Sequence, residues 1–112
     1  MNMSDMNATL QPIRDRFLGL LQGRLEDIRI NLERALEQPD DAAEALSIIE
    51  SILHKIAGTA GTLGYTEMGE KARVVEDRII QDRANDHALQ HKVYLDVIDF
   101  LEISYEVSER AA

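Results

Sequence analysis

The sequence predicts an all-α protein folded as an antiparallel up-down-up-down four-helix bundle. In four segments, apolar residues recur three and four positions apart, which gathers them on one face of a helix. No segment alternates apolar and polar residues in the manner of a half-buried strand. Short connections join the segments, and antiparallel packing is the simplest way for four such helices to bury their apolar faces. The 112 residues are enough for one core.

The first predicted helix runs from Leu10 to about Glu37. Thr9 is its expected N-cap, and Pro12 is tolerated because it falls in the first turn. Gln38-Pro39-Asp40 ends this helix. Residues 1–8 are expected to form a flexible tail, which leaves residues 9–112 as a single domain. The apolar stripe of the first helix comprises Ile13, Phe17, Leu21, Leu25, Ile28, Leu32 and Leu36.

The second predicted helix runs from about Asp41 to Thr62, and Asp40 or Asp41 can cap it. The run from Gly61 to Tyr65 is typical of a helix end followed by a short turn, in which Gly64 is the structural glycine. The apolar stripe of this helix comprises Leu46, Ile49, Ile52, Leu53, Ile56, Ala60 and Leu63.

The third predicted helix begins after a cap at Thr66 and ends near Ala84-Asn85-Asp86, which indicates a break. Its stripe comprises Met68, Ala72, Val75 and Ile79. The fourth helix follows and extends to about Glu106. Its apolar residues at helical spacing are Leu89, Val93, Ile98, Leu101 and Tyr105.

The composition excludes several classes of protein. A formal net charge of −9 and a pI of about 4.7 argue against nucleic-acid binding, which needs a basic surface. The chain has no cysteine, so it has neither disulfides nor thiolate metal sites. No apolar run is long enough to cross a membrane, and the first residues do not resemble a secretory signal. We expect a soluble, cytoplasmic, monomeric protein with no membrane or nucleic-acid partner.

His54 is predicted to point away from the core. At about 100° per residue, it lies roughly opposite the buried side of the second helix. Ser47, Glu50 and Ser51 lie on the same face one or two turns earlier. Gly58 and Gly61 fall within about 40° of the histidine on the following turns, so its face carries almost no side chains there.

Two glycines inside a helix cost about 0.5–1 kcal/mol each relative to alanine, so their positions need a reason. One reason is access, because missing side chains let a phosphoryl group or a partner's backbone come close to His54. The alternative is that the glycines permit close helix packing or begin to unwind the helix. For Gly61, near the turn, the two explanations are equally good; for Gly58, in mid-helix, access is the better one.

The run from Leu53 to Tyr65, LHKIAGTAGTLGY, resembles the signature of histidine-containing phosphotransfer (HPt) domains. That signature is a histidine, a hydrophobic residue two positions later, a glycine four later and a second glycine about ten later. His54, Ile56, Gly58 and Gly64 match it in register, on the second helix of a four-helix chain.

The resemblance implies that His54 is phosphorylated and exchanges its phosphoryl group with an aspartate on a response-regulator receiver domain or a hybrid histidine kinase. Members of the family neither bind ATP nor catalyse transfer alone, so the chain is expected to be no enzyme and to need no cofactor. The receiver would supply the acceptor carboxylate and a divalent metal ion. Neutral imidazole is a nucleophile suited to this chemistry.

One position departs from the family pattern. Many members have Lys or Arg three residues after the histidine, where this chain has Ala57. Lys55 can replace that charge only if its side chain curls back around the helix, and Lys71 or Arg73 on the third helix can supply it instead. Related domains often place a polar residue on the third helix facing the histidine. Glu76 stands at that position, so the resemblance implies that it accepts a hydrogen bond from His54 Nδ1, which leaves Nε2 as the nucleophile. A solvated Glu76 is an equally good interpretation.

Two other functions remain open. His87 and His91 have the i, i+4 spacing of a metal pair, but the sequence offers no specific third ligand, so no metal site is expected. The main alternative is a helical adaptor that binds a partner protein without chemistry.

If the chain is a phosphotransfer protein, we expect the receiver to dock on the second helix around His54 and on part of the third, next to Ala57, Gly58 and Gly61.

Overall fold

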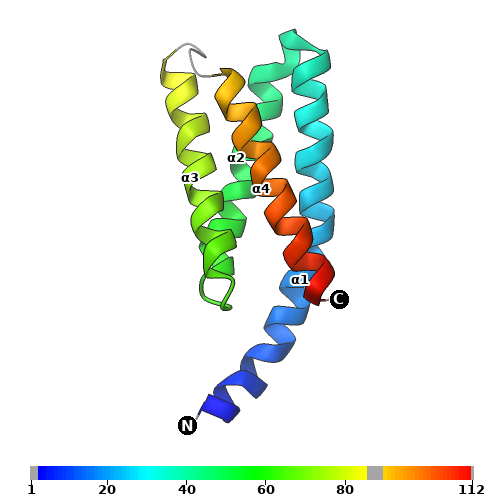
Figure 1. Cartoon of the computed structure of the whole chain (residues 1–112), viewed down its shortest axis with the longest axis vertical. Helices are drawn as coiled ribbons and strands as arrows, with labels where there is room; N and C mark the ends of the chain where they lie inside the picture. The colour runs from blue at the N-terminus through cyan, green and yellow to red at the C-terminus, as the bar shows by residue number, and fades with distance from the viewer. Residues whose placement is uncertain (1–2, 86–89, 112) are drawn as a thin grey trace.

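The computed structural model describes the backbone of residues 3–85 and 90–111 and the side chains of residues 8–85 and 91–110. It contains α1 (Met3–Glu37), a 3-10 turn (Pro39–Asp41), α2 (Ala42–Ala60), α3 (Thr66–Ala84) and α4 (Gln90–Ala111). The described ranges hold no strand and no helix apolar enough to cross a membrane. Successive helices run antiparallel around one core (Figure 1), which confirms the predicted four-helix bundle.

Helix α1 starts earlier than predicted. It begins at Met3, so residues 3–8, expected as a tail, are helical, and Thr9 is not its N-cap. No glycine or proline interrupts residues 3–9, and nothing therefore opposes extension of the helix. Pro12 lies inside the helix and not in its first turn. It cannot donate a hydrogen bond to the carbonyl of Ala8, but both residues are exposed, so water can satisfy that carbonyl. This end of α1 projects beyond the other helices (Figure 1).

The core is formed mainly by the predicted stripes of α1, α2 and α3. Every predicted stripe residue of α3 is buried, as are those of α2 apart from the half-buried Ile52. In α1 the predicted burial is wrong at the two end positions of the stripe, Ile13 and Leu36, because both side chains are about half exposed. At the Leu36 end, the neighbouring Ala35 is buried instead and packs with Ala42 and Ala45. The remaining α1 stripe residues, Phe17, Leu21, Leu25, Ile28 and Leu32, are buried.

The predicted face of α4 is partly wrong. Ile98 is exposed and Tyr105 is only half buried, whereas Val93 and Leu101 are buried as predicted. The helix instead turns a neighbouring stripe to the core, formed by Val93, Val97, Phe100, Leu101, Ser104 and Ser108. Leu89 lies outside the described residues. The buried stripe includes Phe100, one of the largest fully buried side chains of the protein.

The turn between α2 and α3 is held by contacts with α1. Gly64 has a φ of 97°, a conformation that L-residues rarely adopt, so its predicted structural role is confirmed. The Arg14 guanidinium on α1 donates a hydrogen bond to the Leu63 carbonyl (3.0 Å). Tyr65 stacks on Phe17 of α1, with ring centroids 5.6 Å apart. These contacts fix the position at which α2 ends and α3 begins.

The starts of α2 and α3 show no side-chain capping hydrogen bond from the predicted caps. Asp41 occupies the N-cap position of α2, but it has a helical conformation because it ends the 3-10 turn, and its carboxylate pairs with Arg34. Thr66 is the first residue of α3, and Tyr65 precedes it at the N-cap position.

Candidate functional site

His54 lies on the outer side of α2. Its neighbours Leu53 and Ile56 are fully buried and hold that face of the helix against the core. The imidazole is consequently turned outward, and 75% of its side chain is exposed. The predicted orientation of His54 is confirmed.

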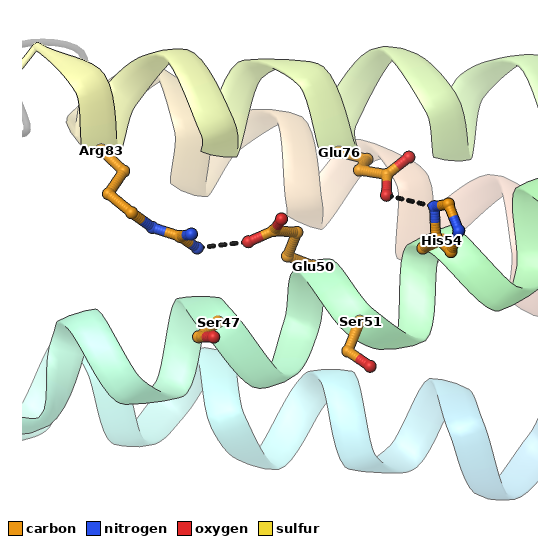
Figure 2. A pocket seen from close by; sticks show the side chains of 6 residues that line it. All are labelled: Ser47, Glu50, Ser51, His54, Glu76 and Arg83. Atoms are coloured by element: carbon orange, nitrogen blue, oxygen red, sulfur yellow. Dashed lines mark hydrogen bonds and ion pairs between the residues drawn. The ribbon is translucent and has the colours of Figure 1, made fainter.

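Glu76 of α3 faces the histidine across the groove between the two helices. Its Oε2 lies 2.7 Å from His54 Nδ1 (Figure 2). The Glu76 side chain is only 13% exposed, so its carboxylate is held in place by the surrounding protein. The predicted contact is present, and the solvated alternative for Glu76 is wrong. When Nδ1 carries the proton and donates to this carboxylate, the lone pair of the ring lies on Nε2.

An open hollow of about 410 Å³ adjoins the histidine. Its lining comes from α2 and α3 and comprises Ser47, Glu50, Ser51, His54, Glu76 and Arg83. The His54–Glu76 pair lies at one end, and an ion pair between Arg83 and Glu50 lies towards the other (Figure 2). The sequence placed Ser47, Glu50 and Ser51 on this face but missed Arg83. Arg83 follows Glu76 by two helical turns, so both lie on the same face of α3. This spacing could have predicted that Arg83 lines the hollow.

The glycines beside His54 have different surroundings. A side chain added at Gly58 would meet nothing within 4 Å, and the residue is exposed, as the access hypothesis requires. Gly61 is also open on its outer side, but its backbone nitrogen lies 3.1 Å from the position of a Cβ built at Gly69. Gly61 therefore also serves close packing of α2 on α3. Ala57 is half buried and packs against the core, so it is a small packing residue at the edge of the site.

The structure does not bring Lys71 to His54. Its Nζ lies 2.6 Å from Asp99 Oδ2 on α4, so the expected support from Lys71 is wrong. Lys71 lies on the α4 side of α3, in line with Arg78, which pairs with Asp96 of α4. Lys55 and Arg73 are exposed, and the contacts found among the described residues include none between either of them and His54. Both remain candidates for the charge missing at Ala57.

A second surface lies on the other side of α2, where it meets α1. An apolar notch of about 190 Å³ is lined by Ile13, Arg16, Phe17, Leu20, Arg24 and Thr59. Gly19 and Gly23, on the same stretch of α1, are exposed and have open space above them. This surface was not predicted from the sequence. It could have been predicted from Leu20, an apolar residue that lies outside the core stripe and close to these two glycines.

The candidate metal pair is only partly visible. His91 is exposed, and His87 lies outside the described residues. Residues 3–85 and 90–111 contain no group of three or more His, Asp or Glu side chains that could hold a metal ion.

A family model described as "Hpt domain" matches residues 13–104, which include the four helices over most of their length and every candidate site residue. No curated protein and no solved structure matches the chain.

Proposed function

Because the chain belongs to the Hpt domain family, we propose that it carries a phosphoryl group on His54 and exchanges it, in the cytoplasm, with an aspartate of a receiver domain. Hpt domains are phosphotransfer carriers in phosphorelays and have no kinase activity of their own, which supports a carrier role for this chain. The observation that supports His54 as the carrier is its geometry. The imidazole is exposed and its Nδ1 lies 2.7 Å from Glu76 Oε2, which leaves Nε2 as the nitrogen available to a partner.

The proposed step is a displacement at phosphorus. The lone pair of His54 Nε2 attacks the phosphorus of an aspartyl phosphate on the receiver. The bond between phosphorus and the aspartate oxygen breaks, and its electron pair stays with the aspartate carboxylate. The product is a phosphoramidate on Nε2, and the proton on Nδ1 does not leave. The reverse step returns the group to an aspartate, and the receiver supplies the divalent ion that offsets charge during transfer.

Glu76 has a positioning role in this proposal. The ring gains formal positive charge when Nε2 bonds to phosphorus, and the carboxylate at Nδ1 offsets that charge. The same hydrogen bond fixes the tautomer and the ring orientation before the reaction, as carboxylates do for other reactive histidines. Because Glu76 is largely buried, it needs little reorganisation to do so.

We propose that the receiver docks mainly on the face formed by α1 and α2. The apolar notch offers Leu20 and Ile13 as contact residues, and Gly58 adjoins its Thr59 wall. Arg16, Arg24 and Lys55 give this face positive charge in a chain of net charge −9. A receiver presents an acidic phosphorylation site, so the charges of the two surfaces are complementary. This surface differs from the expected one, in which part of the third helix was the second contact.

A labelling experiment tests the assignment of His54. Receivers phosphorylated with a radiolabelled small-molecule donor are mixed with the wild-type protein and with His54→Gln. We expect label on the wild type only, in a linkage that is lost in acid and stable in base. Undiminished label on His54→Gln overturns the assignment. If the wild type binds a receiver and never accepts label, the chain is an adaptor.

A further inference from the structure

The hollow beside His54 extends further than the phosphotransfer step requires. Glu50 precedes the histidine by one helical turn, or about 6 Å along the axis, and Ser47 precedes it by two turns. Arg83 reaches across from α3 to pair with Glu50 (Figure 2). The serines are small and exposed, so this part of the hollow is open to an approaching protein.

The charged groups of the hollow are exposed to different degrees. The Arg83 side chain is 49% exposed, that of Glu50 is 21% exposed, and Glu76 is the most buried of the three. A partner that enters the hollow therefore meets the guanidinium first. Arginine has five N–H donors in a planar fork, and the ion pair with Glu50 engages one terminal nitrogen. Donors remain for a second carboxylate.

The ion pair contributes little to the fold. A partly exposed ion pair contributes about 0–1 kcal/mol to stability, because solvent screens it. Helices α2 and α3 are already joined by the core and by the close approach of Gly69 to Gly61. Comparable pairs join α3 to α4 away from His54, including Lys71 with Asp99. The placement of the Arg83–Glu50 pair next to His54 is what sets it apart.

We propose that Arg83, held by Glu50, selects the receiver by binding a carboxylate on the docked domain. Without Arg83, an acidic side chain entering the hollow would face Glu50 and Glu76, and like charges at an interface are strongly unfavourable. With Arg83 in place, the guanidinium lies between two carboxylates, that of Glu50 and that of the receiver, and attracts both. This inference rests on the proposed function and concerns the choice of partner, because Arg83 lies two turns from Glu76 and does not contact His54.

A charge swap tests the inference. The double variant Glu50→Arg with Arg83→Glu keeps an ion pair in the hollow but places the positive charge on α2 and the negative charge on α3. The matched control, Lys71→Asp with Asp99→Lys, does the same between α3 and α4. Each protein is assayed for phosphotransfer against a panel of purified receivers, with the apparent KM and the maximal transfer rate measured separately.

We expect the swap in the hollow to raise the apparent KM for the preferred receiver at least tenfold, with little change in the maximal rate, and to alter the rank order of the panel. The control should keep the rank order. An unchanged rank order in a folded swap variant overturns the inference and leaves the proposed function intact. If the swap variant does not fold, Arg83→Gln replaces it in the assay. We expect the same rise in the apparent KM, and an unchanged rank order would again overturn the inference. Absence of transfer to wild-type protein from every receiver overturns the proposed function, and the inference with it.

Discussion

At His54 the two ring nitrogens have different environments. Nδ1 is 2.7 Å from a largely buried carboxylate, whereas the outer part of the ring is exposed. In the proposed function, this single contact leaves Nε2 as the nitrogen that reacts. If Glu76 has the proposed positioning role, a change at Glu76 should alter the tautomer as well as the transfer rate.

We predict that Glu76→Ala slows phosphotransfer by about tenfold to a hundredfold, the cost seen when a carboxylate that orients a metal-binding histidine is removed. Glu76→Gln should slow it less, since the amide oxygen still accepts from Nδ1–H. Stopped-flow transfer kinetics, with ¹⁵N NMR of the His54 ring, provide the measurement. If Glu76→Ala keeps both the wild-type rate and a pure Nδ1–H tautomer, the positioning role is wrong.

At Gly58 we predict that stability and transfer change in opposite directions. Gly58→Ala should raise the free energy of unfolding by up to about 1 kcal/mol, because the site is helical and has open space for a Cβ. Gly58→Gln should also fold. Transfer should slow modestly for Ala and severely for Gln, since the added side chain fills space that a receiver needs.

Thermal denaturation and transfer kinetics on both Gly58 variants test this prediction. Wild-type transfer by Gly58→Gln would mean that the glycine is not needed for access. Unfolding of that variant would mean that Gly58 packs against another part of the protein.

Among the elements, α2 and α3 make the contact on which the site depends. The Cβ of an alanine at position 69 would lie 3.1 Å from the Gly61 nitrogen and 3.5 Å from the Ala60 Cβ. The first of these atoms belongs to the backbone and cannot rotate away. Gly69 is therefore the residue that allows the two helices to approach, although the sequence analysis did not identify it.

We predict that Gly69→Ala lowers the free energy of unfolding by about 1–3 kcal/mol, the range typical of overpacking. Gly61→Ala is the control, because Gly61 has an ordinary helical conformation (φ −61°) and open space for a Cβ. Chemical denaturation of both variants gives the comparison. Equal stability of Gly69→Ala and the wild type would show that the helices can separate at no cost.

The sequence could predict the buried faces of α2 and α3 because each has one clear apolar stripe. Helix α4 is different: Tyr94, Leu95, Val97, Ile98 and Phe100 place apolar side chains around most of its circumference. Periodicity alone cannot choose between such overlapping stripes. The choice depends on neighbouring helices, which is why Val97 and Phe100 were missed and Ile98 was wrongly placed in the core.

The features of the site that depend on α2 alone could be predicted from the sequence. The outward direction of His54 and the open face at Gly58 follow from positions along α2. The contact with Glu76 was found because the family resemblance supplied the pairing of α2 with α3. Lys71 and Arg83 could not be assigned correctly, because their partners on α4 and α2 depend on the register between helices and on side-chain conformation.

At the scale of the whole molecule, His54 lies between two surfaces of different character. The α1–α2 face is apolar with basic residues at its edges, and the α2–α3 side is a polar hollow. A standard interface covers about 800 Å² on each partner, so one receiver can contact both. The strongly negative net charge makes the local basic residues more important for orienting an acidic partner.

We predict that Leu20→Glu weakens receiver binding about tenfold or more, because it places a charge in the apolar centre of the docking face. Leu95→Glu is the matched control: Leu95 is exposed to a similar degree (53%, against 49% for Leu20) but lies on α4. Isothermal titration with a receiver gives both affinities. Equal weakening by the two variants would contradict docking on α1 and α2.

The most direct test of the proposed function is to identify the phosphorylated atom. The protein is labelled with ¹⁵N, phosphorylated by a receiver and examined by NMR through the coupling between ³¹P and the ring nitrogens. We predict one phosphohistidine, at His54, with phosphorus bonded to Nε2 and a proton retained on Nδ1. Phosphorus on Nδ1 or on another residue would contradict it.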